Sequence, residues 1–270
     1  FDEPTSVLTP QGIQGLFEAI RFLVKNGKTV LFITHKLKEV MEISDSITVL
    51  KNGHYVDTVT PNQTDEHGLA TMMVGREVIL TAQKKDKKQG DALLKVRHLS
   101  MPDYLGREKL KDVSFEIHSG EILGIAGVAG SGQQELVEAL FGLRTGSQGE
   151  ILFDGKNITN LNCREHRLCH IGYVPQDRIS EGINREATLW ENAIMGYHIV
   201  KGFGNRYLLN RKQALSFTNH IIQDFHVKAS SPNLKIQTLS GGNIQKLIVG
   251  REFLQDNRLL IIEDPTRGID

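Results

Sequence analysis

The apolar and polar positions of this 270-residue chain change their period several times along its length. From residue 13 to 24 the apolar side chains recur at helical spacing, and Thr9-Pro10 ahead of them supplies a capping hydroxyl and a first-turn proline. We therefore expect a helix that ends at Gly27. The run 29–34 is apolar or β-branched throughout, which predicts a strand buried on both faces of a parallel sheet, with His35 at its carboxyl end.

The next stretches predict smaller elements and then a boundary. A short helix is expected over 37–43, followed by strands over 46–50 and 55–60 that turn near Asn52-Gly53. Residues 81–91 are polar, rich in lysine and without periodicity. We interpret them as a solvated linker rather than a nucleic-acid-binding arm.

Beyond this linker the pattern predicts a layered α/β domain. Alternating stretches over 94–99, 110–117 and 150–153 are typical of an antiparallel layer. From 187 to 227 the pattern becomes helical, which predicts a helical insertion, and the apolar run 259–262 predicts a further strand.

A glycine-rich stretch connects a predicted strand to a predicted helix in this second part. Residues 121–126 are short and apolar enough for a buried strand, and the positions after Gln134 have helical spacing. Gly127 and Gly132 fit the phosphate-binding template of Gly, four residues, Gly, Lys and Ser/Thr, but Gln133 and Gln134 replace its lysine and hydroxyl. A helix start offers unpaired N–H groups and about half a positive charge, so an anion can still bind. A plain structural turn into a helix is the alternative.

Composition narrows the class of protein. The chain is 39% hydrophobic and 24% charged, with 32 basic and 32 acidic side chains, which is typical of one large or two smaller globular domains. Zero net charge gives no electrostatic reason to expect nucleic acid or an anionic membrane as the main partner. No apolar run is long enough to span a bilayer and no signal peptide opens the chain. Cys163 and Cys169 fit neither a redox pair nor a zinc site, which favours a reduced, cytosolic chain.

One short motif occurs twice, with an offset of 261 residues. It reads Phe1-Asp2-Glu3-Pro4-Thr5 at the start and Ile262-Glu263-Asp264-Pro265-Thr266 near the end. Such a repeat predicts two copies of one domain. Because the first copy would lack most of the strand that carries its carboxylates, we expect the chain to be a fragment.

The stretch Leu239-Ser240-Gly241-Gly242-Asn243 is the most diagnostic pattern, since a Ser-Gly-Gly turn that opens a helix is a second anion cradle. Together with the glycine loop, Gln176, the Asp2-Glu3 motif and His35, it resembles the nucleotide-binding domain of an ATP-binding-cassette (ABC) ATPase. The resemblance is strongest to the tandem-cassette subunit of bacterial importers for simple sugars and nucleosides, in which the second cassette is degenerate.

The resemblance implies a fold and a division of the chain. The fold would be an α/β P-loop NTPase cassette, with a mainly parallel core sheet, an antiparallel β layer and a helical subdomain, in two incomplete copies. Residues 1–80 would be the C-terminal part of a first cassette and 81–91 the linker. Residues 92–270 would be a second cassette, truncated shortly after Glu263-Asp264.

The resemblance also implies roles, with ATP and Mg²⁺ as the cofactors. Glu3 matches the base that polarises the attacking water, and His35 matches the histidine that contacts the γ-phosphate. The magnesium shell would involve Asp2, Gln176 and Glu263. The nucleotide-binding positions would be Gly127, Gly130, Ser131, Gly132, Gln133, Gln134, Gln176, Ser240, Gly241, Gly242 and the aromatic Tyr104. For Tyr104, a loop tyrosine without a role is an equal alternative.

The second copy departs from the family pattern at two places. Glu263 and Asp264 stand in reverse order relative to Asp2-Glu3, and a carboxylate misplaced by roughly 1 Å can cost a hundredfold in rate. Gln133 removes a unit charge beside the phosphates, of order 4 kcal/mol at about 4 Å in an effective dielectric near 20. We expect this site to bind nucleotide weakly and not to turn it over, and the fragment alone to be inactive.

An importer motor implies further components. The expected partners are integral-membrane permease subunits and a periplasmic or lipoprotein solute-binding protein that acts through them, with no nucleic acid. The expected location is the cytoplasmic face of the inner membrane. Two alternatives remain open: a soluble tandem-cassette ATPase that acts on ribosomes, which should keep lysine in both loops and have a longer linker, and a non-catalytic nucleotide-binding regulator.

Overall fold

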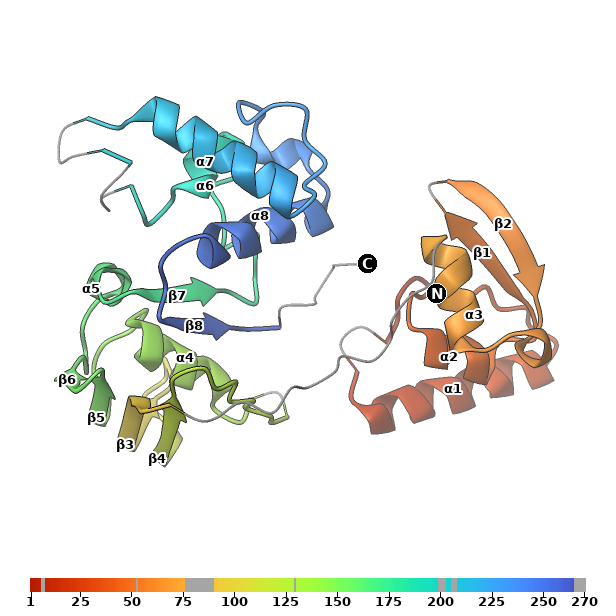
Figure 1. Ribbon diagram of the computed structural model, residues 1–270. Coiled ribbons are helices and arrows are strands. Elements are labelled where there is room, and N and C mark those ends of the chain that lie inside the picture. Colours follow the sequence, from red (N-terminus) through yellow and green to blue (C-terminus); the bar gives the residue numbers. More distant parts are fainter. Residues whose placement is uncertain are drawn as a thin grey trace. The chain divides into compact units, whose positions relative to one another are not determined.

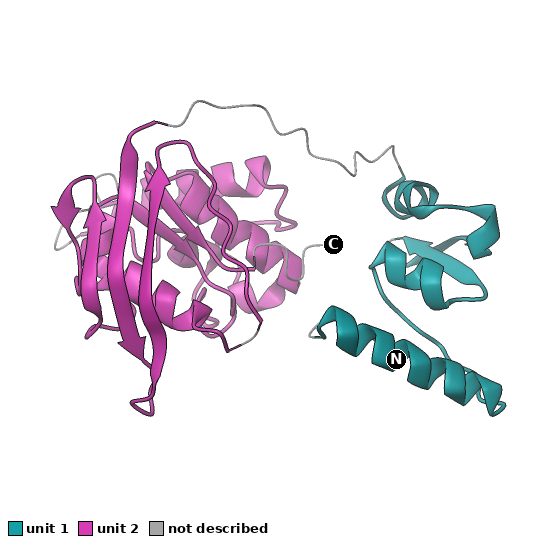
Figure 2. Cartoon of the chain, turned by 90° about the horizontal axis from the view of Figure 1, so that it is seen from below, with its two compact units in different colours: residues 1–87 teal, residues 88–270 magenta. Residues whose placement is uncertain are grey.

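The computed structural model describes residues 1–5, 8–51, 53–75, 90–128, 130–198, 203–204 and 208–264. The chain divides into two compact units, Phe1–Lys87 and Lys88–Asp270 (Figure 2). Most of the expected linker, residues 81–89, lies outside the described residues.

In its described residues, the first unit has four helices and one β-hairpin. Its elements are α1 (Pro10–Lys25), α2 (Leu37–Ile43), β1 (Ile47–Lys51), β2 (His54–Val59), the 3₁₀ helix η1 (Pro61–Gln63) and α3 (Glu66–Val74). The side chain of Thr9 accepts a hydrogen bond from the Gly12 backbone, which confirms the expected cap of α1. The expected helix 37–43 and the hairpin are also confirmed, the hairpin strands to within one residue.

The expected buried strand over 29–34 is wrong. Among the described residues, this segment makes one isolated parallel bridge, between Asp2 and Ile33, with backbone hydrogen bonds to Phe1 and Glu3 only, and Leu31 is 75% exposed. A strand needs a hydrogen-bonded neighbour along its length, and the apolar pattern does not reveal whether that neighbour exists.

The second unit contains two sheets and a helical layer. Its elements are β3 (Ala92–Pro102), β4 (Glu108–His118), α4 (Gln133–Phe141), β5 (Gln148–Phe153), β6 (Lys156–Asn157), α5 (Cys163–Leu168), β7 (Ile171–Val174), α6 (Leu189–Ala193), α7 (Arg211–Asp224), the 3₁₀ helix η2 (Ile236–Thr238), α8 (Gly241–Phe253) and β8 (Leu259–Ile262). The antiparallel layer, in the order β4-β3-β5-β6, the helical insertion and the closing strand β8 are all confirmed.

Helix α4 lies between the antiparallel sheet and the β7–β8 pair (Figure 1). Its buried residues Leu136, Leu140 and Phe141 share one core with β3, β5 and β7. A second core joins α6, α7 and α8. Among the described residues, no helix is long and apolar enough to cross a membrane.

The expected strand over 121–126 is also wrong. This segment has no strand assignment, and Ile122 and Ile125 are 97% and 52% exposed. Leu123 and Ile125 line one side of a cavity whose other side is β8, so the two segments are not hydrogen-bonded neighbours. Within the described part of the second unit, parallel pairing is confined to β7 and β8, less than the mainly parallel sheet that we expected.

A buried ionic cluster joins α5, α8 and the segment that follows α6. Glu252 is fully buried, and its carboxylate pairs with Arg167 at 3.1 Å and with Arg251 at 2.9 Å. Tyr197 donates a third hydrogen bond to it. Burial acts to raise the pKa of Glu252, but the charges of Arg251 and Arg167 outweigh burial and hold this pKa below its ordinary value.

We predict that Glu252→Gln lowers the free energy of unfolding of the second unit by about 3–5 kcal/mol, because it leaves two buried guanidinium groups without a counter-charge. Glu186→Gln is the matched control, since its ion pair with Lys235 is exposed and worth less than about 1 kcal/mol. Urea unfolding of both variants measures the difference. Equal losses would show that the buried cluster contributes no more than a surface pair.

Candidate functional site

The glycine loop leads into α4 through two residues whose backbone conformation only glycine adopts easily. Gly130 and Gly132 have φ angles of 83° and 101°, in the left-handed region that a Cβ disfavours. Gly132 is the N-cap of α4 and has no side chain to occupy the unpaired N–H groups of the first turn. The loop therefore leaves the positive end of a nine-residue helix open to an anion.

The side chain of Gln133 folds back over this loop. Its Nε2 donates to the carbonyl oxygen of Val128 at 3.2 Å, and the backbone N–H of Ser131 donates to the same oxygen at 3.2 Å. A Cβ placed on Gly127 would clash with the Gln133 amide. The position that the phosphate-loop template gives to lysine is thus filled by a neutral donor that braces the loop.

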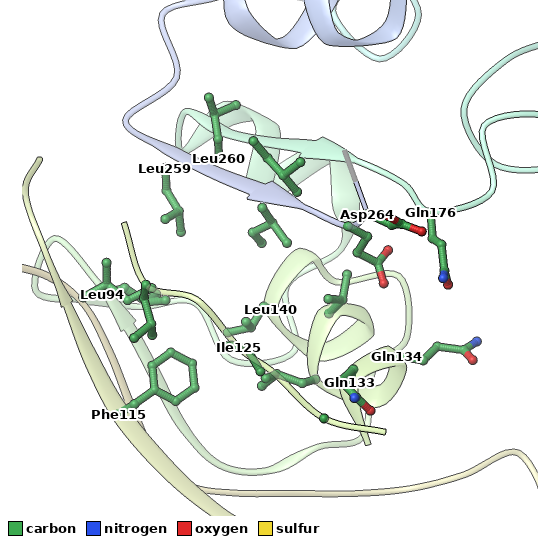
Figure 3. A pocket seen from close by; sticks show the side chains of 18 of the residues that line it. Leu94, Phe115, Ile125, Gln133, Gln134, Leu140, Gln176, Leu259, Leu260 and Asp264 are labelled. Atoms are coloured by element: carbon green, nitrogen blue, oxygen red, sulfur yellow. The ribbon is translucent and has the colours of Figure 1, made fainter. Parts of the chain in front are cut away.

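A cavity of about 670 Å³ opens beside the loop (Figure 3). Of the candidate nucleotide and metal positions, six line it: Gly127, Gly130, Gln133, Gln134, Gln176 and Glu263. Figure 3 shows Gln133 and Gln134 at the start of α4, and Gln176 and Asp264 across from them. The structure therefore brings the glycine loop and the second acidic motif to one cavity.

Glu263 is a half-buried residue in the lining of this cavity. Its Oε2 accepts a hydrogen bond from the Tyr173 hydroxyl at 2.6 Å. Burial raises the pKa of Glu263 above its ordinary value, and the negative charges of Glu181 and Glu138 add to that effect. The hydrogen bonds from Tyr173 and from the Gln176 backbone oppose it without cancelling it.

The donors fit a phosphate better than a magnesium ion. Backbone N–H groups at the start of α4 suit phosphate oxygens. Magnesium prefers ionised carboxylates and water, whereas burial favours the protonated form of Glu263. Among the described residues, no group of three or more His, Cys, Asp and Glu side chains could hold a metal.

Gln134 and Tyr104 are joined through Glu138. The Gln134 Nε2 and the Tyr104 hydroxyl both donate to Glu138 Oε1, at 3.0 and 2.9 Å. The Arg144 guanidinium lies 4.4 Å from the centroid of the Tyr104 ring and pairs with Glu138 at 2.9 Å. The hydroxyl hydrogen bond raises the pKa of Tyr104, and the ring stays exposed near the start of α4 without lining the cavity.

The Ser240-Gly241-Gly242 turn forms a separate feature at the start of α8. Ser240 is the N-cap, and its hydroxyl accepts from the Asn243 amide at 2.8 Å rather than from the helix backbone. A Cβ on Gly241 would lie 2.5 Å from the Arg178 guanidinium. The turn does not line the cavity beside the glycine loop.

The first unit brings Glu3 and His35 together. The Glu3 backbone N–H donates to the Ile33 carbonyl at 2.8 Å, and Glu3 Oε1 lies 2.7 Å from His35 Nδ1. Both side chains are partly exposed, and Asp2 beside them is exposed. A carboxylate in contact with an imidazole at a solvent-facing edge is suited to accept a proton from water.

Comparison with known proteins decides the family. A family model described as "ABC transporter" matches residues 110–267. The chain belongs to the ABC transporter family. The sequence-based resemblance is thereby confirmed.

This ABC transporter chain is similar to three curated proteins along its whole length. It is 38% identical to the glucose import ATP-binding protein TsgD13 of Haloferax volcanii, of which it covers 49%. It is 36% identical to the nucleoside import ATP-binding protein NupA of Lactococcus lactis and 39% identical to the guanosine import ATP-binding protein NupO of Bacillus subtilis, and it covers 53% of each. The chain spans about half the length of the relatives that it matches.

Solved structures support the ABC cassette fold. A dimeric post-hydrolysis state of the ATP-binding cassette MJ0796 aligns with a TM-score of 0.56 at 22% identity, over 66% of this chain and 76% of that one. The CbiO1 protein of Clostridium perfringens aligns with a TM-score of 0.51 at 24% identity, over 67% and 68%. These likenesses show the fold.

Sequence reasoning missed Glu39, which holds the ABC chain's first acidic motif in place. Glu39 is buried, and its Oε2 accepts from the Thr5 hydroxyl at 2.6 Å and from the Thr34 hydroxyl at 3.3 Å. Lys36 neutralises it at 3.2 Å. Glu39 thus ties the segment after Glu3 to the segment before His35. No motif marks it, because Thr5, which it ties to Thr34, lies 34 residues away in the sequence.

We predict that Glu263→Gln stabilises the second unit at neutral and alkaline pH. Glutamine keeps an acceptor for Tyr173 but cannot ionise, whereas the raised pKa of Glu263 means that its ionised form is penalised in the fold. The stability that Glu263 gives the parent relative to the variant is fully present below the ordinary glutamate pKa. It is lost as the pH rises through the raised pKa that Glu263 has in the folded chain.

Thermal unfolding between about pH 4 and about pH 8 measures this difference. The variant should have the higher midpoint at the alkaline end, and the gap should shrink towards acid pH. The exposed Glu186→Gln serves as the control, and the difference between its unfolding midpoint and that of the parent should not change with pH. A gap that widens as the pH falls would contradict the assignment of a penalised carboxylate.

Proposed function

We propose that this chain is part of an ATP-binding and ATP-hydrolysing subunit that energises import of nucleosides or simple sugars. The observation that carries the nucleotide-binding part is the glycine loop, which opens the N-terminus of α4 onto the cavity that Gln176 and Glu263 line. The import part rests on the names of the relatives, which are import ATP-binding proteins for glucose, nucleosides and guanosine.

The proposal divides the chain into two incomplete cassettes. Residues 1–80 are the C-terminal part of a first cassette, 81–91 are the linker and 92–270 are a degenerate second cassette. The repeated acidic motif, at an offset of 261 residues, supports this division. Partition into two compact units at Lys87 is compatible with it.

The two units have different roles in this proposal. In the second, the loop from Gly127 to Gly132 binds the phosphates through backbone N–H groups, and the exposed face of Tyr104 stacks on the base. The turn at Ser240 serves the phosphates of the opposite site. Magnesium, when bound, neutralises charge on the phosphates.

The hydrolytic residues belong to the first unit. Glu3 accepts the proton of the attacking water, and His35, which contacts Glu3, orients towards the terminal phosphate. Asp2 is placed to orient the metal shell. The second site lacks a lysine in its loop, and its carboxylates Glu263 and Asp264 stand in reverse order relative to Asp2 and Glu3, so it binds nucleotide without useful turnover.

The partners follow from the same proposal. Permease subunits in the membrane bind the cassettes, and a solute-binding protein delivers the solute to the permease. The subunit then lies peripherally on the cytoplasmic face of the inner membrane. A neutral net charge agrees with the absence of nucleic acid from this set.

We predict that Gln133→Lys tightens ATP binding by the chain at least about tenfold, because it returns a unit charge to the loop. Gln213→Lys adds the same charge to an exposed position on α7 and is the matched control. Isothermal titration with ATP, and separately with tripolyphosphate, measures both variants. Equal gains from the two substitutions would show that the loop is not where the phosphates bind.

We also predict that the chain releases phosphate from ATP no faster than buffer does. Glu3 and His35 belong to the unit whose own phosphate loop is not in the sequence, and the loop that is present lacks lysine. A steady-state phosphate assay with ATP and magnesium tests this, with Glu3→Gln as the control. Sustained turnover that Glu3→Gln abolishes would contradict the division into two roles.

A further inference from the structure

The cavity beside the glycine loop offers little positive charge to a phosphate ligand. The described residues that line it include no lysine and no arginine, but they include the carboxyl groups of Glu263 and Asp264. Backbone N–H groups and a helix dipole provide only about half a positive charge. A polyphosphate, with several negative charges, therefore needs a cation from outside this lining.

Lys109 is the side chain that the structure places against the loop. It lies near the start of β4, and its Nζ is 3.8 Å from the position that a Cβ would take on Gly130. Its carbonyl oxygen is 3.3 Å from the corresponding position on Gly132. The backbone and the ammonium group of Lys109 thus both lie alongside the turn that leads into α4.

The ammonium group of Lys109 has no acidic partner among the described residues. Other basic side chains on the same sheet do: Lys95 pairs with Glu116 at 3.2 Å, and Arg97 pairs with Glu150 at 3.3 Å. Lys109 is exposed, so the cost of leaving it unpaired is small. An unpaired ammonium group beside an open helix N-terminus raises the positive potential where an anion would bind.

We propose that Lys109 binds the phosphate groups of the nucleotide in place of the lysine that the loop lacks. The inference rests on the proposed function, since it assigns a residue to the same loop. A lysine on a flexible stem acts as a mobile point charge and does not need to sit within the loop to reach a phosphate. At Gly132 the approach of the Lys109 carbonyl is also tight, since a Cβ there would lie 3.3 Å from it.

This role makes a specific prediction about ligand chemistry. Because Lys109 acts on the phosphates, its removal should weaken the binding of ATP and of tripolyphosphate by the same factor. A change of base from adenine to guanine should not alter that factor. It should also lower the dependence of affinity on salt, because one charge-charge contact is lost.

The experiment is isothermal titration of the whole chain with ATP, GTP and tripolyphosphate at two salt concentrations. Lys109→Gln should weaken the binding of all three ligands by about fivefold or more, whereas Lys109→Arg should keep most of the parent's affinity. The matched control is Lys111→Gln, because Lys111 is exposed on the same strand but has no contact with the loop glycines. This variant should change the affinity less than twofold, which is about the effect of a screened surface charge. Gln133→Lys added to Lys109→Gln should recover binding.

The possible outcomes distinguish an error in the role of Lys109 from an error in the proposed phosphate binding at the glycine loop. If the parent chain binds neither ATP nor tripolyphosphate, phosphate binding at this loop is wrong and the role of Lys109 falls with it. If the parent binds both and Lys109→Gln matches Lys111→Gln, only the role of Lys109 is wrong. A loss that Gln133→Lys does not rescue, accompanied by a lower midpoint of thermal unfolding, would show that Lys109 merely supports the fold and would overturn the inference.

Discussion

The site depends on the burial of α4 between the antiparallel sheet and β7. Leu136 and Leu140 are each 5% exposed, and each buried side chain of this size contributes about 1.5–3 kcal/mol. The Phe141 ring packs on the Tyr173 ring of β7, with 4.8 Å between the centroids. Because the helix cannot move in this layer, its first turn and the glycine loop before it are held at one place. The same packing also positions Glu263, because the Tyr173 hydroxyl donates a hydrogen bond to its carboxyl group.

Within that frame, polar side chains are arranged by hydrogen bonds that no single motif encodes. Glu138 lies on the buried side of α4 and gathers Gln134, Tyr104 and Arg144 around one carboxylate. A carboxylate removed from water is costly unless it is paired, and here the pairing with arginine offsets that cost. The result is that the turn between β3 and β4, which carries Tyr104, is tied to the helix that the phosphate loop opens.

The parts of the fold that the sequence predicts well are those with a local cause. The start of α1 follows from the Thr9 cap and Pro10, and α2 and β8 follow from short periodic or apolar runs with clear ends. The glycine loop and the Ser240 turn follow from backbone requirements that side-chain identity reveals. For these, the residue types themselves determine the local geometry.

The parts that it predicts badly depend on distant partners. Residues 29–34 and 121–126 have the composition of buried strands, but a strand exists only with a hydrogen-bonded neighbour, which composition does not specify. The same limit applies to charged side chains. Glu39 and Lys109 look like ordinary surface residues in the sequence, and their significance arises from contacts with Thr5 and Thr34 in one case and with Gly130 in the other.

The two copies of the acidic motif show how the second site changed as a whole. The offset of 261 residues aligns Asp2 with Glu263 and Glu3 with Asp264. In the first copy, both carboxylates are exposed and Glu3 contacts His35. In the second, the longer side chain reaches inward to Tyr173, where burial favours its protonated form. Relative to the phosphate-loop template, the site has lost the positive charge of a lysine at Gln133, and burial opposes ionisation of the carboxyl group at Glu263. Both changes act against charge beside the cavity: one removes a cation from the loop, and the other makes the ionised form of the facing carboxyl group less favourable.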